Sequence, residues 1–473
     1  MVQPWKLLVY IAADNSLYDD AQVSLQEITS ASLFSNVETI VQIDGPNAEL
    51  SSRYRCSGGS KKLIWEAPDS YSGDRKVRLE DFLAASVDHP VESKRIFLVL
   101  WGHGAGLDHV YFYKDPPAAP AAPAAIPTPV PVPVPGTMGV APAVANAAPN
   151  AVARTIQFQP AELLNGNNAN RYVDDIALAG VLTNFSKSMN QKIDLLGFDA
   201  CMMAMVEIWH EIRDSTSLVV ASDEELPKGS WPYALILSDL AKYPGMDAST
   251  LSTVIVSRFL ERYSMQGHRT RVSLSAVDLR GCIPLSLAMR DLVAELTKVA
   301  GNGQDRRRMF RARDSSRTSD EVTYIDLGMF CNELSESFAD STGVHITADA
   351  VLAVLKQYPY VIYHRDFKEN EPVNAYGVAL YFPDNLAPTR QDVITFAATH
   401  SLTQGKKFPP SAGKFPPSAG KFPPSAGKGV GVSAAGQREI SGYEILWDHY
   451  QELSFSTVTG WATLIENVLK LGY

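Results

Sequence analysis

The segment KIDLLGFDACM, residues 192–202, decides the fold class of this chain, because a short apolar run there ends directly before Cys201. A buried strand that passes straight into a helix has this pattern. A second apolar run, RIFLVLWGHGAG at residues 95–106, ends on His103, which lies between two glycines. The carboxyl ends of neighbouring parallel strands meet at one edge of a sheet, where ligands bind. The sequence therefore predicts that two strand ends present a thiol and an imidazole to one site.

Apolar runs and helical patterns alternate through the first half of the chain. The predicted strands are residues 6–12, 37–43, 63–67, 96–101, 193–198 and 218–222. The predicted helices are residues 16–31, 79–87, 174–189 and 201–212. Strands that are continuously apolar and separated by helices indicate a parallel sheet covered on both faces. We therefore predict an α/β sandwich with a mostly parallel sheet flanked by helices.

The same kinds of pattern continue beyond residue 240. They predict helices at residues 249–263, 283–299, 324–337 and 348–357, strands at 272–277 and 377–382, and further helical spacing within 443–471. This half is compatible with an extension of the first sheet and with a separate subdomain. We assign residues 1–113 and 154–240 to a core, and residues 241–403 and 437–473 to a C-terminal α/β extension packed on it.

Two segments do not fit this core. Residues 114–153 are rich in proline and alanine, and residues 404–436 contain three tandem copies of KFPPSAG. Proline removes backbone donors and favours an extended, solvated conformation, so neither segment suits a helix or a strand. We expect both to be disordered surface insertions, which cost little stability because loop-closure entropy rises slowly with length.

Composition excludes several classes of partner. The chain has 473 residues, of which 45% are hydrophobic and 20% charged, and a formal net charge of −10. An acidic chain is a poor candidate for a nucleic-acid partner, since phosphate binding needs a concentrated positive face. The basic run at residues 306–317 is interpreted as an exposed loop, with a protease-sensitive loop as the alternative. No run of 18 apolar residues occurs, so the sequence predicts no membrane partner.

The four cysteines are scattered and form no CxxC pair, which favours unpaired thiols over a zinc site or a disulfide framework. A strand pattern begins almost at residue 5, so the printed sequence has no signal-peptide order of basic, apolar and small residues. We therefore expect a cytoplasmic protein, or a secreted one if the true start lies upstream.

Cys201 and His103 are the candidate catalytic pair. A thiol reacts as the thiolate, and the first turn of a helix favours that form because its amides carry partial positive charge. The alternatives are a buried structural cysteine and an imidazole satisfied within a glycine turn. Gly102 and Gly104 favour a site, because glycine lets the backbone approach a ligand and offer an amide to it. Nothing visible in the sequence requires a third orienting residue.

Asp199 precedes the cysteine by two residues. If the backbone is extended there, both side chains leave the same side of the strand. A carboxylate beside the nucleophile suits recognition of a basic side chain, whereas direct contact with the sulfur would disfavour the thiolate. The alternative is that Asp199 caps the following helix.

Five ordered blocks make the chain resemble the clostripain family of cysteine peptidases. They are VYIAADNSL at residues 9–17, LVLWGHGAG at 98–106, IDLLGFDACMMAMVEI at 193–208, VVASDEELPKGSWPY at 219–233 and YGVALYFP at 376–383. The resemblance implies a caspase-like fold and an endopeptidase that acts on proteins or peptides. It also implies that Cys201 is the nucleophile, His103 the base, and the amides of Gly104 and Cys201 the oxyanion site.

The resemblance extends to specificity and activation. Asp199 would select Arg or Lys at the residue before the scissile bond (P1), and Trp231 would contact substrate. Apart from the resemblance, Asp14 and Asn15 follow the first predicted strand, so we expect them near the same sheet edge and in contact with substrate. Relatives usually carry a further acid before the tryptophan, where residues 227–231 here read PKGSW. Some members bind calcium and are cut between the histidine and the cysteine. The chemistry itself needs no cofactor, and no EF-hand-like loop is visible. Lys114 and Arg154, which flank the proline-rich insert, are the expected self-cleavage sites.

Two other functions remain open from the sequence. A catalytically weak relative could act as a scaffold, because proline-rich segments bind the aromatic grooves of polyproline-binding partners. A thiol hydrolase or transferase that acts on small amides would use the same Cys201–His103 pair, and only its substrate would separate it from a peptidase.

Overall fold

The computed structural model describes most of the chain outside the two insertions. The described residues are 5–33, 37–45, 51–68, 74–87, 95–104, 106–107, 173–227, 229–265, 272–316, 323–340, 342–357, 361–365, 375–387 and 447–472. The proline-rich insert, the KFPPSAG repeats, Lys114 and Arg154 lie outside them. Among the described residues, no helix is both long and apolar enough to span a bilayer.

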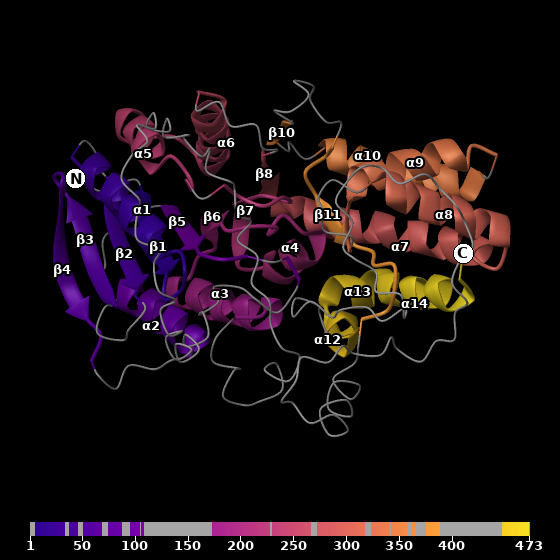
Figure 1. The fold of residues 1–473 in the computed structure, drawn as a ribbon, viewed down its shortest axis with the longest axis horizontal. Coiled ribbons are helices and arrows are strands. Elements are labelled where there is room, and N and C mark those ends of the chain that lie inside the picture. The colour runs from indigo at the N-terminus through magenta and orange to yellow at the C-terminus, as the bar shows by residue number, and fades with distance from the viewer. Residues whose placement is uncertain are drawn as a thin grey trace, which may run out of the picture.

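One mixed sheet runs through the molecule in the strand order β10-β8-β7-β6-β5-β1-β2-β3-β4 (Figure 1). Its central strands β2, β1, β5, β6 and β7 are parallel, and the outer strands on both sides pair antiparallel. The strands are β1 (Trp5–Ala12), β2 (Glu38–Asp44), β3 (Ser52–Ser57), β4 (Ser60–Glu66), β5 (Arg95–Trp101), β6 (Ile193–Asp199), β7 (Thr216–Ala221), β8 (Val272–Asp278) and β10 (Val361–Arg365). This arrangement confirms the predicted α/β sandwich.

Helices cover both faces of the sheet. Successive side chains of a strand point to opposite faces, so Leu8 and Tyr10 join one buried cluster while Val9 and Ile11 join the other. The first face packs on α2 (Arg75–Val87), α3 (Asp175–Met189) and α4 (Val206–Ile212). The second packs on α1 (Tyr18–Ala31), α5 (Tyr233–Lys242) and α6 (Ala248–Met265), which Figure 1 shows above the sheet. Burial of both faces explains the continuously apolar strands.

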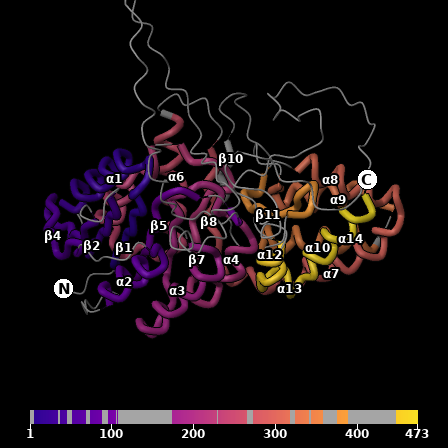
Figure 2. The backbone as a smooth tube through the Cα atoms, turned by 60° about the horizontal axis from the view of Figure 1, so that its bottom comes forward, coloured from indigo at the N-terminus to yellow at the C-terminus, as the bar shows by residue number. Residues whose placement is uncertain are grey.

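The C-terminal half both extends the sheet and builds a helical layer. Strands β8 and β10 lie at one sheet edge. Helices α7 (Cys282–Val299), α8 (Gly303–Ser315), α9 (Leu327–Ser337) and α10 (Thr342–Gln357) gather beyond that edge. The last helices are α12 (Trp447–Glu452), α13 (Ser454–Thr459) and α14 (Trp461–Leu471); α13 and α14 pack on α7, and α12 packs on α13 (Figure 2). A separate two-stranded sheet pairs β9 (Tyr324–Asp326) with β11 (Ala379–Tyr381). This half therefore adds two strands to the main sheet, and its helices α7–α10 and α12–α14 share one buried cluster with α2, α3 and α4.

Three local predictions were wrong. Residues 306–317 do not form an exposed loop: most of the run lies in α8, where Phe310 and Arg313 are buried. The segment 324–337, predicted as one helix, begins with the short strand β9. The helix predicted from residue 201 begins only at Val206, after an N-cap at Met205. The last difference changes the surroundings of Cys201.

Candidate active site

Three parallel strands end side by side at the predicted site. In the ladders, Trp101 of β5 pairs with Ile11 of β1 and with Asp199 of β6. The chain order reverses between β1 and β5, because β1 leads to β2 on one side while β5 is followed by β6 on the other. Such a switch point opens a crevice at the carboxyl ends of the strands. His103 and Cys201 each lie two residues beyond the paired Trp101 and Asp199.

His103 is nearly buried, and a side chain of the loop after β1 contacts it. Its Nε2 atom lies 3.3 Å from Oγ of Ser16, whose own side chain is exposed. Asn15 fixes this loop, because its amide nitrogen donates to the carbonyl of Ala12 and its side-chain oxygen accepts from the amide of Leu17. A hydroxyl at this distance can hold the imidazole in one orientation. Ser16 was missed in the sequence, where its only signal is its place in the loop that follows the strand ending at Ala12.

The backbone of Gly104 touches the backbone of Cys201. A Cβ atom on Gly104 would lie 2.2 Å from the carbonyl oxygen of Cys201 and 2.9 Å from its amide nitrogen. No side chain fits at that separation, so glycine is required by close approach rather than by a turn. The amide of Gly102 also donates to the carbonyl of Asp199 at 3.3 Å. The loops that carry the two candidate catalytic residues are thus packed directly on each other.

Cys201 does not lie in the first turn of a helix. It occupies a turn between β6 and α4, and the next residue, Met202, has a left-handed backbone with φ of 58°. The expected stabilisation of the thiolate by a helix terminus is therefore wrong. The sulfur instead accepts a hydrogen bond from the backbone amide of Leu226, with an N···S distance of 3.2 Å. An amide aimed at sulfur also favours negative charge there. The segment after β7, not α4, supplies this polar contact.

Asp199 is fully buried at the end of β6. Its Oδ2 atom accepts hydrogen bonds from the hydroxyl of Ser230, from the hydroxyl of Tyr233 at 2.7 Å and from the amide of Trp231 at 3.3 Å. Burial, together with the charge of Asp199, raises the pKa of Tyr233 well above its ordinary value, so this hydroxyl stays a donor. The N-cap of α4 is Met205, which makes the capping alternative for Asp199 wrong.

Trp231 and Asn15, the other expected substrate contacts, have structural contacts of their own. The Trp231 ring is buried against Gly197 of β6, where a Cβ atom would lie 2.7 Å from Cη2 of the indole. Its backbone carbonyl accepts from Arg262 at 3.2 Å. The side chain of Asn15 makes hydrogen bonds with Ala12 and Leu17 within the loop after β1. Contact of either residue with substrate stays a prediction.

A buried ion cluster anchors the end of β1. Asp14 pairs with Arg75 and Arg78 of α2, and both arginines also pair with Asp44 of β2. All four side chains are almost inaccessible, and Tyr10 donates a further hydrogen bond to Asp44 at 2.7 Å. Burial raises the pKa of Asp44 and lowers that of Arg75. Breaking a buried pair leaves an uncompensated charge, so this cluster holds the loop that carries Ser16.

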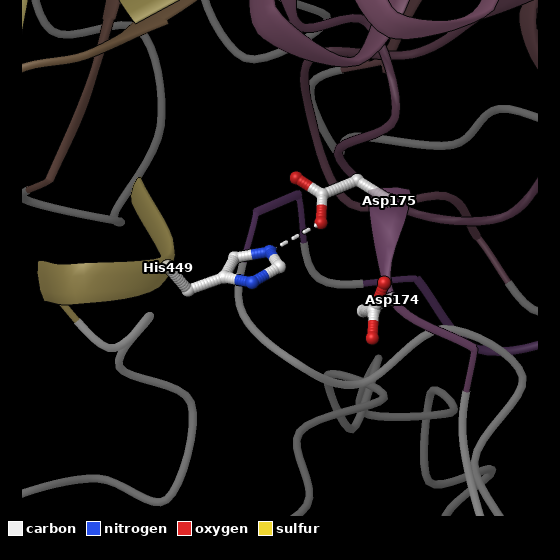
Figure 3. A group of neighbouring side chains, drawn as sticks. All are labelled: Asp174, Asp175 and His449. Carbon is white, nitrogen blue, oxygen red and sulfur yellow. Dashed lines mark hydrogen bonds and ion pairs between the residues drawn. The ribbon is translucent and has the colours of Figure 1, made fainter. Parts of the chain in front are cut away.

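A second titratable cluster does not fit calcium. Asp174, Asp175 and His449 lie close together, as Figure 3 shows. His449 Nε2 is 2.6 Å from Asp175 Oδ1, which raises the pKa of His449 although burial opposes this. Asp174 is occupied as the N-cap of α3, accepting from Ala177 at 2.6 Å. Calcium takes six to eight oxygen ligands, and an imidazole is not one of them. The cluster is an ion pair between α12 and the start of α3.

The sequence comparison points to one family. The profile described as the clostripain family matches residues 166–467, more than half of the chain. The match includes Asp199 and Cys201 and begins after His103. No curated protein matches the sequence.

Solved structures share the fold. A secreted C11 cysteine protease from Bacteroides thetaiotaomicron, in complex with an irreversible peptide inhibitor, is 16% identical with a TM-score of 0.54, over 83% of this chain and 95% of that one. An inactive zymogen C11 protease from Parabacteroides distasonis is 14% identical with a TM-score of 0.51, over 81% of this chain and 93% of that one. At these identities the likeness confirms the predicted caspase-like fold alone.

Proposed function

The chain belongs to the clostripain family and is a cysteine-type peptidase, and on this premise we propose that Cys201 and His103 form its catalytic dyad. The contact between the backbones of Gly104 and Cys201 is the observation that carries the proposal. It brings the loop after β5 against the turn after β6, which is the arrangement that a base and a nucleophile need. The nearby hydroxyl of Ser16 supports the assignment of His103.

The proposed reaction is acyl transfer followed by hydrolysis. The Cys201 thiolate attacks the scissile carbonyl carbon, and the resulting oxyanion is stabilised by the backbone amides of Gly104 and Cys201. His103 donates a proton to the leaving amine as the C–N bond breaks, which leaves a thioester on Cys201. His103 then takes a proton from water, whose oxygen attacks the thioester and releases the acid and the thiolate. These steps balance without a cofactor.

We further propose that Asp199 favours Arg or Lys at P1. Its carboxylate is buried at the strand end, two residues before the nucleophile, and three neutral donors hold it in place. A buried carboxylate attracts a cationic side chain more strongly than an exposed one. The peptide inhibitor bound to the Bacteroides thetaiotaomicron protease supports a peptide substrate here.

Activation, calcium and location also stay proposals. Self-cleavage at Lys114 and Arg154 would follow from a preference for basic P1 residues, since both flank the insert between the two dyad residues. Calcium binding has only the resemblance behind it, because the cluster of Asp174, Asp175 and His449 does not fit the ion. The comparisons give no support to the expected cytoplasmic location, and one relative is described as secreted.

A panel of fluorogenic peptides with Arg, Lys, Asp, Leu or Ala at P1 tests the proposal. Hydrolysis should be fastest for Arg and Lys, should vanish in Cys201→Ala and His103→Ala, and should not require added calcium. Equal hydrolysis by the wild type and Cys201→Ala would refute the dyad. Absence of hydrolysis by the folded wild type would favour the scaffold function. Mass spectrometry of the wild type after incubation detects cleavage after Lys114 or Arg154 directly.

A further inference from the structure

The two-stranded sheet of β9 and β11 touches both loops that carry the proposed dyad. On one side, the amide of Ala379 in β11 donates to the carbonyl of Ala204 at 2.8 Å, and Ala379 forms a parallel bridge with Met205. The segment that follows Cys201 is thereby extended onto β11. These bonds explain why residues 202–205 are not helical, since their backbone is used in long-range pairing.

On its other strand, the sheet supports the loop after His103 through Tyr324. The buried Tyr324 hydroxyl accepts a hydrogen bond from the amide of Leu107 at 3.1 Å. Gly106 has a left-handed backbone with φ of +66°, and a Cβ atom there would lie 2.8 Å from both Cε2 and Cζ of the tyrosine ring and from Sδ of Met205. The loop after His103 therefore rests on Tyr324 and on the segment after Cys201 at once.

Buried hydrogen bonds hold the two-stranded sheet in place. Tyr324 pairs with Tyr381 and Asp326 pairs with Ala379 across the ladder. Asp326, fully buried, accepts from the amides of Met329, Tyr376 and Gly377 at 2.7–2.8 Å. A strand pair fixed in this way sets the separation between the loops on its two sides.

We propose that Tyr324 is a positioning residue for catalysis, which acts through Leu107 and Gly106 to hold His103 in register with Cys201. The inference rests on the proposed dyad and gives the C-terminal region a part in the reaction. Misplacement of a catalytic group by about 1 Å can cost roughly 100-fold in rate. Loss of one hydrogen bond leaves the ring in place, so a smaller effect is expected from Tyr324→Phe.

The test compares Tyr324→Phe with Tyr450→Phe. The control loses a buried hydroxyl that donates to Glu207 at 3.1 Å, and Glu207 also accepts from the amide of Tyr381 in β11. It therefore perturbs the same sheet but keeps the hydrogen bond between Tyr324 and Leu107. Tyr324→Phe should lower kcat about 10-fold with KM changed less than about 2-fold, an effect of one buried hydrogen bond on loop position. Tyr450→Phe should keep the wild-type kcat. Tyr324→Leu, which also loses the ring, should lower kcat further.

A second readout does not need peptide hydrolysis. The rate of Cys201 alkylation by iodoacetamide, followed by peptide mapping across pH, reports the coupling of the thiol to His103. Tyr324→Phe should shift this pH profile and Tyr450→Phe should not. If Tyr324→Phe matches Tyr450→Phe in kcat, pH profile and melting temperature, the inference is overturned while the dyad stands. If the wild type and Cys201→Ala hydrolyse the peptides equally, the proposed dyad is wrong. If, in addition, Cys201 in Tyr324→Phe is alkylated with the pH profile of the wild type, the positioning role is overturned as well.

Discussion

Oγ of Ser16 lies 3.3 Å from Nε2 of His103, which connects the end of β1 to the loop after β5 across the switch point of the sheet. The contact places a hydroxyl beside the imidazole of the proposed dyad. Because Ser16 is exposed while His103 is nearly buried, the pair forms the outer rim of the site.

Removal of the Ser16 hydroxyl should weaken catalysis without abolishing it. A single hydrogen bond contributes about 0.5–1.5 kcal/mol, so Ser16→Ala should lower kcat by about 3- to 10-fold and shift the pH profile of kcat/KM. Ser16→Thr keeps the hydroxyl and should restore most of the rate. An unchanged pH profile in Ser16→Ala would show that the serine does not orient His103.

A methyl group on Gly104 should abolish activity. It would collide with the carbonyl oxygen of Cys201 at 2.2 Å, so the two loops must separate and the proposed oxyanion donors move. Loss of one oxyanion donor costs about 100- to 1,000-fold in kcat, and Gly104→Ala should fall at least that far. Gly180→Ala in α3 is the matched control, since nothing lies within 4 Å of its Cβ position. Equal kcat values for the two variants would contradict the packed arrangement.

Neutralising Asp199 should change specificity more than general activity. Asn keeps an acceptor for Ser230 and Tyr233 but removes the charge that attracts a basic P1 residue. A hydrogen bond to a charged group contributes about 1.5–3 kcal/mol, so kcat/KM for Arg and Lys peptides should fall about 10- to 100-fold relative to Leu peptides. Asp194→Asn, at the start of the same strand, should leave this ratio alone. A uniform loss in Asp199→Asn would indicate a structural role only.

Glu207 should make stability decrease as pH rises. Burial raises the pKa of Glu207 from 4.5 to about 7, so between these values the folded state binds more protons than the unfolded state. The free energy of unfolding then falls with rising pH, by at most about 1.4 kcal/mol per pH unit from this group. Glu207→Gln keeps an acceptor for the amide of Tyr381, and its melting temperature should vary less with pH between pH 5 and pH 7. The exposed Glu66→Gln serves as the control, and parallel curves for wild type and Glu207→Gln would refute the linkage.

Much of the sheet was predictable because its signals are local. The apolar runs that end before His103 and Cys201 each form a buried parallel strand, and neighbouring strand ends share one edge. Arginine-rich α8 was missed although a signal was present. Its N-cap Asn302 accepts from the amide of Gln304, and Met309 and Phe310 supply a buried face. Charged residues dominate the run, so the helical spacing of its few apolar residues is a weak signal.

The start of α4 could not have been found from the sequence alone. Residues 201–205 are apolar enough to continue a helical pattern, but long-range partners take their backbone groups. The amide of Met202 donates to the carbonyl of Glu224, that of Ala204 donates to Ser222, and the carbonyl of Ala204 accepts from Ala379. These bonds replace the helical ladder. Such competition depends on segments that lie up to 175 residues away along the chain.

By itself, the sequence determined the alternation of strands and helices and the placement of Cys201 and His103 at strand ends, because apolar runs and glycines act over a few residues. Only the tertiary structure decided what meets them there: Ser16 at the imidazole, the Leu226 amide at the sulfur, and Tyr324 beneath the histidine loop. Each of these contacts joins segments that lie far apart in the chain. Their geometry is set by strand order and by the packing of the C-terminal half on the sheet, which no local pattern encodes.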